Sequence, residues 1–121
     1  MAYGSITDFM HDVGDGVGEF LRDEEKQDFT PLRLDEIVKN YIDERGFLSI
    51  FILSRQVNAY IKKNVTAQGL AYVDPPFGQE TSFPEDYFEG DLYVFLTNVL
   101  TLLDLETKRR VREFFRLNRT V

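Results

Sequence analysis

The chain has 121 residues, no cysteine, 11 Phe, 6 Tyr and a formal net charge of −7. This length fits one domain with a core of its own, and the lack of cysteine excludes disulfides, thiolate metal sites and a Cys nucleophile. The acidic balance disfavours a general affinity for phosphate backbones.

Charge is unevenly distributed along the chain. Residues 1–46 hold 12 acidic and 5 basic side chains, whereas residues 104–121 hold 3 acidic and 6 basic ones. Such asymmetry steers partners, or it pairs the two ends within one molecule. The first residues lack a basic segment followed by a continuous apolar run, so we expect no signal peptide. We expect a cytoplasmic location, or a place in a particle assembled there.

Residues 5–25 carry apolar side chains in helical phase, interrupted by Gly14, Gly16 and Gly18. Each glycine costs about 1 kcal/mol relative to Ala inside a helix, which predicts one helix held by packing or two short helices with a joint. We interpret residues 1–26 as an amphipathic arm that docks in a groove on a partner, and residues 27–121 as a helical core domain. The expected partner-binding residues of the arm are Ile6, Phe9, Met10, Val13, Val17, Phe20 and Leu21.

The remaining helices are predicted by apolar residues that recur at steps of three and four. Residues 32–45 form one such segment, and we favour another over 49–64, although residues 47–53 alone also fit a buried strand. Residues 90–105 are apolar over most of the helical circumference, so neighbours must cover them on several sides. The proline- and glycine-containing residues 65–84 read as loop, with one short strand at 69–73.

Asp104 has the position and chemistry of an N-cap for a last helix over 105–117. We expect Leu105, Val111, Phe114 and Phe115 to face inward in this helix. The fold expected is therefore mostly α: a bundle of four to five helices with room for a short β element near 69–73. The basic residues expected to contact a partner are Arg109, Arg112 and Arg116.

The sequence gives little support for a catalytic function. One side of the first predicted helix carries four side chains of types that bind metals: Asp8, His11, Asp12 and Asp15. The same pattern is typical of the solvent-exposed side of an amphipathic helix, and we favour this interpretation. His11 is the only histidine, so a Ser-His-Asp arrangement has one candidate base in an exposed place. We expect no enzyme, no cofactor, no metal and no small-molecule substrate.

The function predicted is non-enzymatic protein–protein interaction. The chain would be a small adaptor or a structural subunit that binds another protein or copies of itself, in a ring, a filament or a virus-like particle. The alternative is a DNA-binding regulator, because the predicted element order resembles that of a winged helix. The residues that would contact DNA in this alternative lie at 54–64 and are Arg55, Gln56, Asn58, Lys62 and Lys63.

Overall fold

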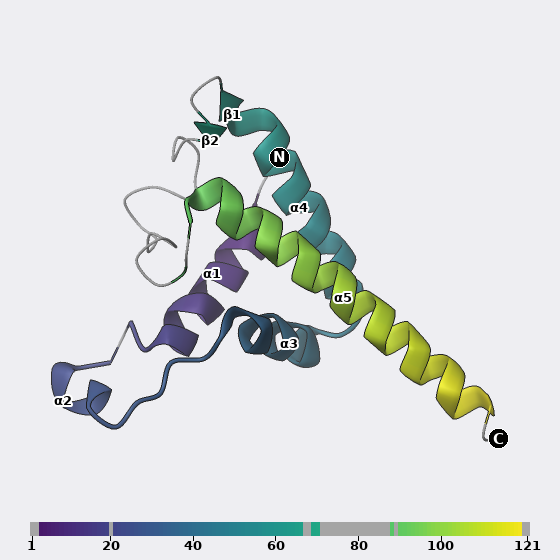
Figure 1. Cartoon of the computed structure of the whole chain (residues 1–121), viewed down its shortest axis with the longest axis horizontal. Coiled ribbons are helices and arrows are strands. Elements are labelled where there is room, and N and C mark those ends of the chain that lie inside the picture. The colour runs from purple at the N-terminus through teal and green to yellow at the C-terminus, as the bar shows by residue number, and fades with distance from the viewer. Residues whose placement is uncertain (1–2, 20, 67–68, 71–87, 89, 120–121) are drawn as a thin grey trace.

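Five helices and one short hairpin make up the part of the chain that the structure describes. The computed structural model describes residues 3–19, 21–66, 69–70, 88 and 90–119 (Figure 1). In chain order the elements are α1 (Gly4–Val17), α2 (Asp23–Lys26), α3 (Leu34–Arg45), α4 (Leu48–Asn64), β1 (Val65–Thr66), β2 (Gly69–Leu70) and α5 (Leu92–Arg119). This confirms the predicted mostly α-helical bundle. The two strands pair antiparallel, and residues 71–73 of the predicted strand lie outside the described residues.

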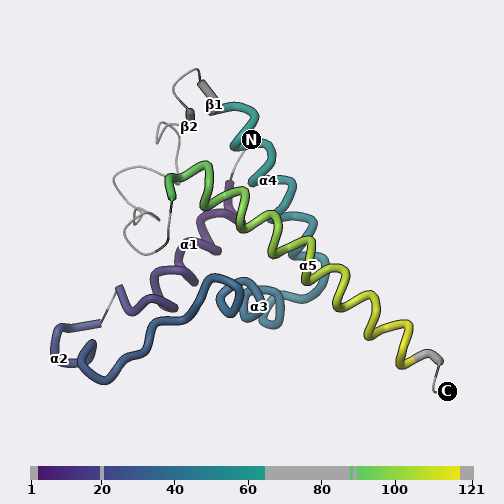
Figure 2. The backbone as a smooth tube through the Cα atoms, viewed as in Figure 1, coloured from purple at the N-terminus to yellow at the C-terminus, as the bar shows by residue number. Residues whose placement is uncertain are grey.

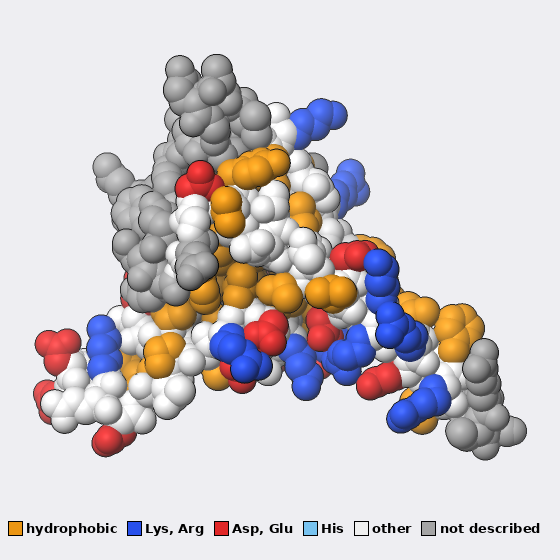
Figure 3. Space-filling model, viewed as in Figure 1, with side chains coloured by type: hydrophobic (Ala, Val, Ile, Leu, Met, Phe, Trp, Pro, Cys, Tyr) orange, Lys and Arg blue, Asp and Glu red, His pale blue; other side chains and the backbone are white. Residues whose placement is uncertain are grey.

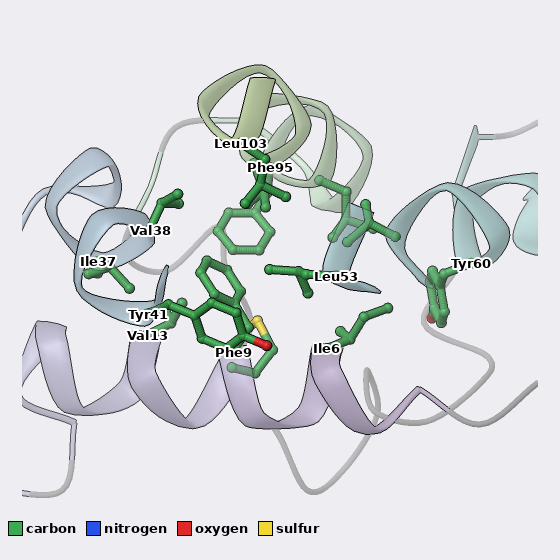
Figure 4. Packing of buried hydrophobic residues seen from close by; sticks show 14 of the residues in the cluster. Ile6, Phe9, Val13, Ile37, Val38, Tyr41, Leu53, Tyr60, Phe95 and Leu103 are labelled. Carbon is green, nitrogen blue, oxygen red and sulfur yellow. The ribbon is translucent and has the colours of Figure 1, made fainter. Parts of the chain in front are cut away.

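The core lies between four helices. Figure 4 shows α1 and α5 on opposite sides of the buried cluster, with α3 and α4 flanking it. The Phe9 ring of α1 meets the Tyr41 ring of α3 edge to face, with 5.5 Å between ring centroids. The buried apolar residues are Ile6, Phe9, Met10, Val13, Ile37, Val38, Tyr41, Ile42, Ile50, Leu53, Val57, Tyr60, Leu92, Phe95, Leu96, Val99 and Leu103.

Helices α3 and α4 follow each other with almost no linker. The carboxylate of Glu36 accepts the backbone N–H of Arg33 at 3.1 Å, which fixes the start of α3. At the other end Gly46 has φ +93°, a conformation that favours glycine, and only Gly46 and Phe47 separate the two helices. Residues 48–53 belong to α4, so the helix is the correct interpretation of the apolar run and the strand is wrong.

The N-terminal segment is part of the core. We therefore correct the picture of an arm that waits for a partner, because Ile6, Phe9, Met10 and Val13 of α1 are at most 5 % exposed within this chain. The glycines serve close packing rather than a loose joint. A Cβ on Gly16 would lie 2.8 Å from Ile37 Cγ1, and the helix ends at Gly18 with φ +76°.

Residues 92–119 form one helix instead of two. The expected break at Asp104 is absent: α5 runs from Leu92 to Arg119, and the Asp104 carboxylate pairs with Lys108 one turn later at 3.0 Å. Nothing in this stretch forces a break, since residues 92–119 contain neither glycine nor proline. The helix leaves the bundle in its second half and projects toward the C-terminus (Figures 1 and 2).

Candidate functional site

The projecting half of α5 is the most unusual surface of the molecule. The helix has 28 residues, which corresponds to about 42 Å at 1.5 Å per residue. Its buried residues end at Leu103, and its last turns extend beyond the other helices (Figure 2). We call residues 104–119 the α5 arm.

Large apolar side chains of the α5 arm face solvent. Phe114 is 61 % exposed, Phe115 58 % and Leu117 63 %, and the two phenyl rings lie 5.8 Å apart. Counted from the buried Leu103, steps of seven, four and three residues lead to positions 110, 114 and 117, and each step returns to nearly the same side of a helix. Phe114 and Leu117 therefore lie on the side of α5 that is buried within the bundle. The prediction that Leu105, Val111, Phe114 and Phe115 face inward is wrong, because all four are exposed. Phe114 lies on the core side of the helix but beyond the end of the bundle, whereas Leu105, two residues from Leu103, lies on the opposite side.

An ion-pair network fixes the base of the α5 arm to α3. Arg110 donates to Asp43 at 2.6 Å and to Glu106 at 3.1 Å, and Arg109 donates to Glu106 at 2.8 Å. The hydrogen bond from Arg110 lowers the pKa of Asp43. Hydrogen bonds from Arg109 and then Arg110 lower the pKa of Glu106 against the opposing effect of its burial. The direction in which the arm leaves the bundle is thus held by charged hydrogen bonds at its first turns.

Three predicted partner-binding cations lie on the α5 arm in two different situations. Arg109 is occupied by Glu106 and Glu113, at 2.8 and 3.3 Å. Arg112 and Arg116 are exposed and form no ion pair within the described part of the chain. At a spacing of four residues, Arg112 and Arg116 share one side of the helix. That side lies away from the side of Phe114.

The predicted partner-binding residues near the N-terminus divide into two groups. Ile6, Phe9, Met10 and Val13 are inside the core, as described above, and Phe20 lies outside the described residues. Val17, the last residue of α1, and Leu21, which follows the helix, are partly exposed. Only these last two keep apolar surface that another molecule could cover without opening the bundle.

The residues predicted for DNA contact lie on α4, and one of them has another role. Gln56 is turned toward α1, where its side-chain oxygen accepts the backbone N–H groups of Ser5 at 2.9 Å and Ile6 at 3.3 Å. It satisfies free N–H groups at the start of α1, so the prediction that it contacts bases is corrected. Arg55, Asn58, Lys62 and Lys63 are exposed.

A second apolar surface lies at the start of α4. Its members are exposed by 39 to 72 %: Phe47, Leu48, Phe51 and Ile52. They face away from the buried side of α4, which carries Ile50, Leu53 and Val57. This surface is flanked by no acidic residue of its own helix, since Leu48–Asn64 contains neither Asp nor Glu.

The candidate metal residues do not gather into a site in the described part of the chain. No group of three or more His, Asp or Glu side chains there could hold a metal ion. Asp12, one of the four, instead binds Arg45 at 2.9 Å, and that guanidinium lies 4.0 Å from the centre of the Tyr41 ring. Within the same residues, no helix combines the length and apolar character needed to cross a bilayer.

Sequence reasoning missed the exposed apolar side of the α5 arm because it treated helical phase as evidence of burial. The available signal was length: an uninterrupted helix from residue 92 to residue 119 is longer than the bundle that the other helices can form beneath it. Comparison with known protein families, curated proteins and solved structures finds no match for this chain.

Proposed function

We propose that this chain is a non-enzymatic assembly subunit that associates with other protein chains through the apolar side of the α5 arm. The observation that carries the proposal is the exposure of Phe114, Phe115 and Leu117 on a helix that projects from the bundle. Exposed aromatic side chains grouped in this way are typical of protein interaction sites. The base of the arm is clamped to α3, so a partner meets it in a defined orientation.

Burial of the two exposed Phe residues would contribute measurably to association. A fully buried Phe side chain is worth about 2 to 3 kcal/mol, and the two rings expose 61 and 58 % of their area. Covering both rings would contribute about 3 kcal/mol, which changes a dissociation constant roughly a hundredfold.

The test compares native masses of complexes isolated from the cells that make the protein. The natural chain is expected at a mass above that of one chain, and Phe114→Ser with Phe115→Ser is expected at the mass of one chain. The control is Leu48→Ser with Phe51→Ser, which removes exposed apolar area on α4 and leaves the α5 arm intact. Equal masses for the natural chain and the Phe114/Phe115 variant would refute the proposal.

A second candidate function is duplex DNA binding by α4, favoured by the composition of this helix and by the element that follows it. The helix has no acidic residue, its exposed Arg55, Asn58 and Lys62 follow one another along its outer side, and the β1–β2 hairpin comes directly after it. Binding should weaken steeply with salt, and Arg55→Ala with Lys62→Ala should reduce the slope of log K against log salt by about 2. Fluorescence anisotropy of a labelled duplex measures this slope, and a slope unchanged in the variant would exclude α4 as the contact.

A further inference from the structure

Two separate surfaces of the described chain carry charged side chains without an ion-pair partner, and the charges of these two surfaces are opposite. Of the carboxylates in the described residues, seven form no ion pair, and six of these belong to α1, α2 and the segments that follow them. We call these six the acidic face: Asp8, Asp15, Glu19, Asp23, Glu24 and Asp28. Lys26 is the one cation without an ion pair between residues 8 and 28 of the described chain.

The acidic face and the α5 arm cannot meet within one molecule. Figure 1 shows α2 and the C-terminus at opposite ends, and Figure 3 shows acidic side chains gathered at the α2 end and basic ones along the arm. Arg112 and Arg116 on the arm are thus separated from the carboxylates that would suit them. Only a second chain can bring the two surfaces together.

Charge also decides among the surfaces that a second copy offers to the arm. The arm of the other copy presents the same unpaired Arg112 and Arg116, and α4 presents Arg55 and Lys62, so both contacts place like charges together. The acidic face offers opposite charge. Next to α2 it also has two apolar side chains that are only partly covered in one chain, namely Leu21 and Phe29.

We infer that the occupant of the α5 arm is the acidic face of a second copy, so that the copies associate head to tail. This inference rests on the proposed function and names the partner at that same site. Phe115 lies three residues from Arg112 and beside Arg116, so these three side chains share the contacting side of the arm. Phe115 covers Leu21 and Phe29 of the next copy, and Arg112 and Arg116 pair with carboxylates near α2. Such a contact uses two different surfaces and leaves one of each free, so it builds rings or filaments.

The experiment exchanges the charges of the two surfaces in the full chain. One variant carries Arg112→Glu with Arg116→Glu, and the other carries Asp23→Lys with Glu24→Lys. Each variant alone places like charges where the arm meets α2 of the next copy, and it is expected to sediment as single chains at concentrations where the natural chain forms larger species. A mixture of the two restores opposite charges at both contacts and is expected to sediment as larger species again.

A matched control separates this contact from a general effect of charge. Arg55→Glu with Lys62→Glu changes the net charge by the same amount on α4 and is expected to associate like the natural chain. The inference is overturned if the natural purified chain stays single, if either charge variant alone associates like the natural chain, or if the mixture stays single. Loss of the complex in the Phe114/Phe115 variant together with any of these results would leave the proposed function intact and assign the arm to a different protein.

Discussion

Gln56 joins two helices through a single amide group. Its side-chain oxygen accepts the N–H groups of Ser5 and Ile6 at 2.9 and 3.3 Å, which otherwise have no partner in the first turn of α1. Gln56→Leu should lower the free energy of unfolding by about 1 to 2 kcal/mol, because it leaves partly buried donors unsatisfied. Urea denaturation followed by circular dichroism measures this change.

The control for this prediction lies on the same helix. Asn58 is exposed, so Asn58→Leu should change the free energy of unfolding by no more than about 0.5 kcal/mol. An equal loss in both variants would show that the effect comes from α4 itself and not from the start of α1.

Among elements, α3 and α5 are joined by a clamp that depends on pH. Asp43 and Glu106 have lowered pKa values because Arg110 and Arg109 donate hydrogen bonds to their ionised forms. A carboxyl whose pKa is lower in the folded state stabilises the fold above its unfolded pKa, and this contribution is lost as pH falls through the folded pKa. Asp43→Asn with Glu106→Gln should therefore cost about 1 kcal/mol near neutral pH and less below about pH 4.

The measurement is the free energy of unfolding of both proteins across this acidic range. The difference between them should shrink as pH falls, since acid removes the same charges that the substitutions remove. In a matched variant, Glu24→Gln with Asp28→Asn, the replaced carboxylates have no ion-pairing partner in the described chain. Its free energy of unfolding should change with pH in parallel with that of the natural protein. A difference that is constant with pH would mean that packing, not charge, holds the two helices together.

The sequence predicted elements well where local signals and burial agree. Helices α3 and α4 follow from the apolar spacing of Ile37, Val38 and Tyr41 and of Leu53, Val57 and Tyr60, all of which are buried. For the same reason, the spacing of Leu92, Leu96 and Val99 correctly predicted the buried half of α5. The spacing of apolar residues shows which side of a helix is apolar, but only the tertiary structure shows what covers that side.

The sequence failed where tertiary structure decides between equivalent patterns. The stripe of α1 and the stripe of the α5 arm look alike in sequence, but Phe9 is 2 % exposed and Phe114 is 61 % exposed. The glycines of α1 also fitted two interpretations, a helix held by packing or a joint between two short helices. The structure shows that Ile37 lies so close to Gly16 that a larger side chain would collide with it. Gln56 gave no sequence signal, since its partners Ser5 and Ile6 are about fifty residues away.

For the whole molecule, the bundle and the part of the α5 arm beyond the clamp should be energetically separate. The cluster of buried residues ends at Leu103 and the clamp at Arg110, so the residues beyond them add little to the core. Deletion of residues 112–121 should therefore change the free energy of unfolding by no more than about 0.5 kcal/mol, while association is lost. Denaturation and sedimentation of the same sample measure the two effects.

Hydrogen exchange checks this separation in the natural chain. Under conditions where the chain exists as single molecules, backbone amides of residues 112–117 should exchange much faster than those of residues 95–103, because the side chains at 112–117 are exposed whereas most of those at 95–103 are buried or partly buried. On association the arm amides should become protected, whereas those of residues 95–103 should not change, since neither contact surface includes them. Slow exchange of the arm in single chains, or a loss of more than about 2 kcal/mol on deletion, would mean that the arm folds back on its own bundle and that its apolar side is not free for a partner.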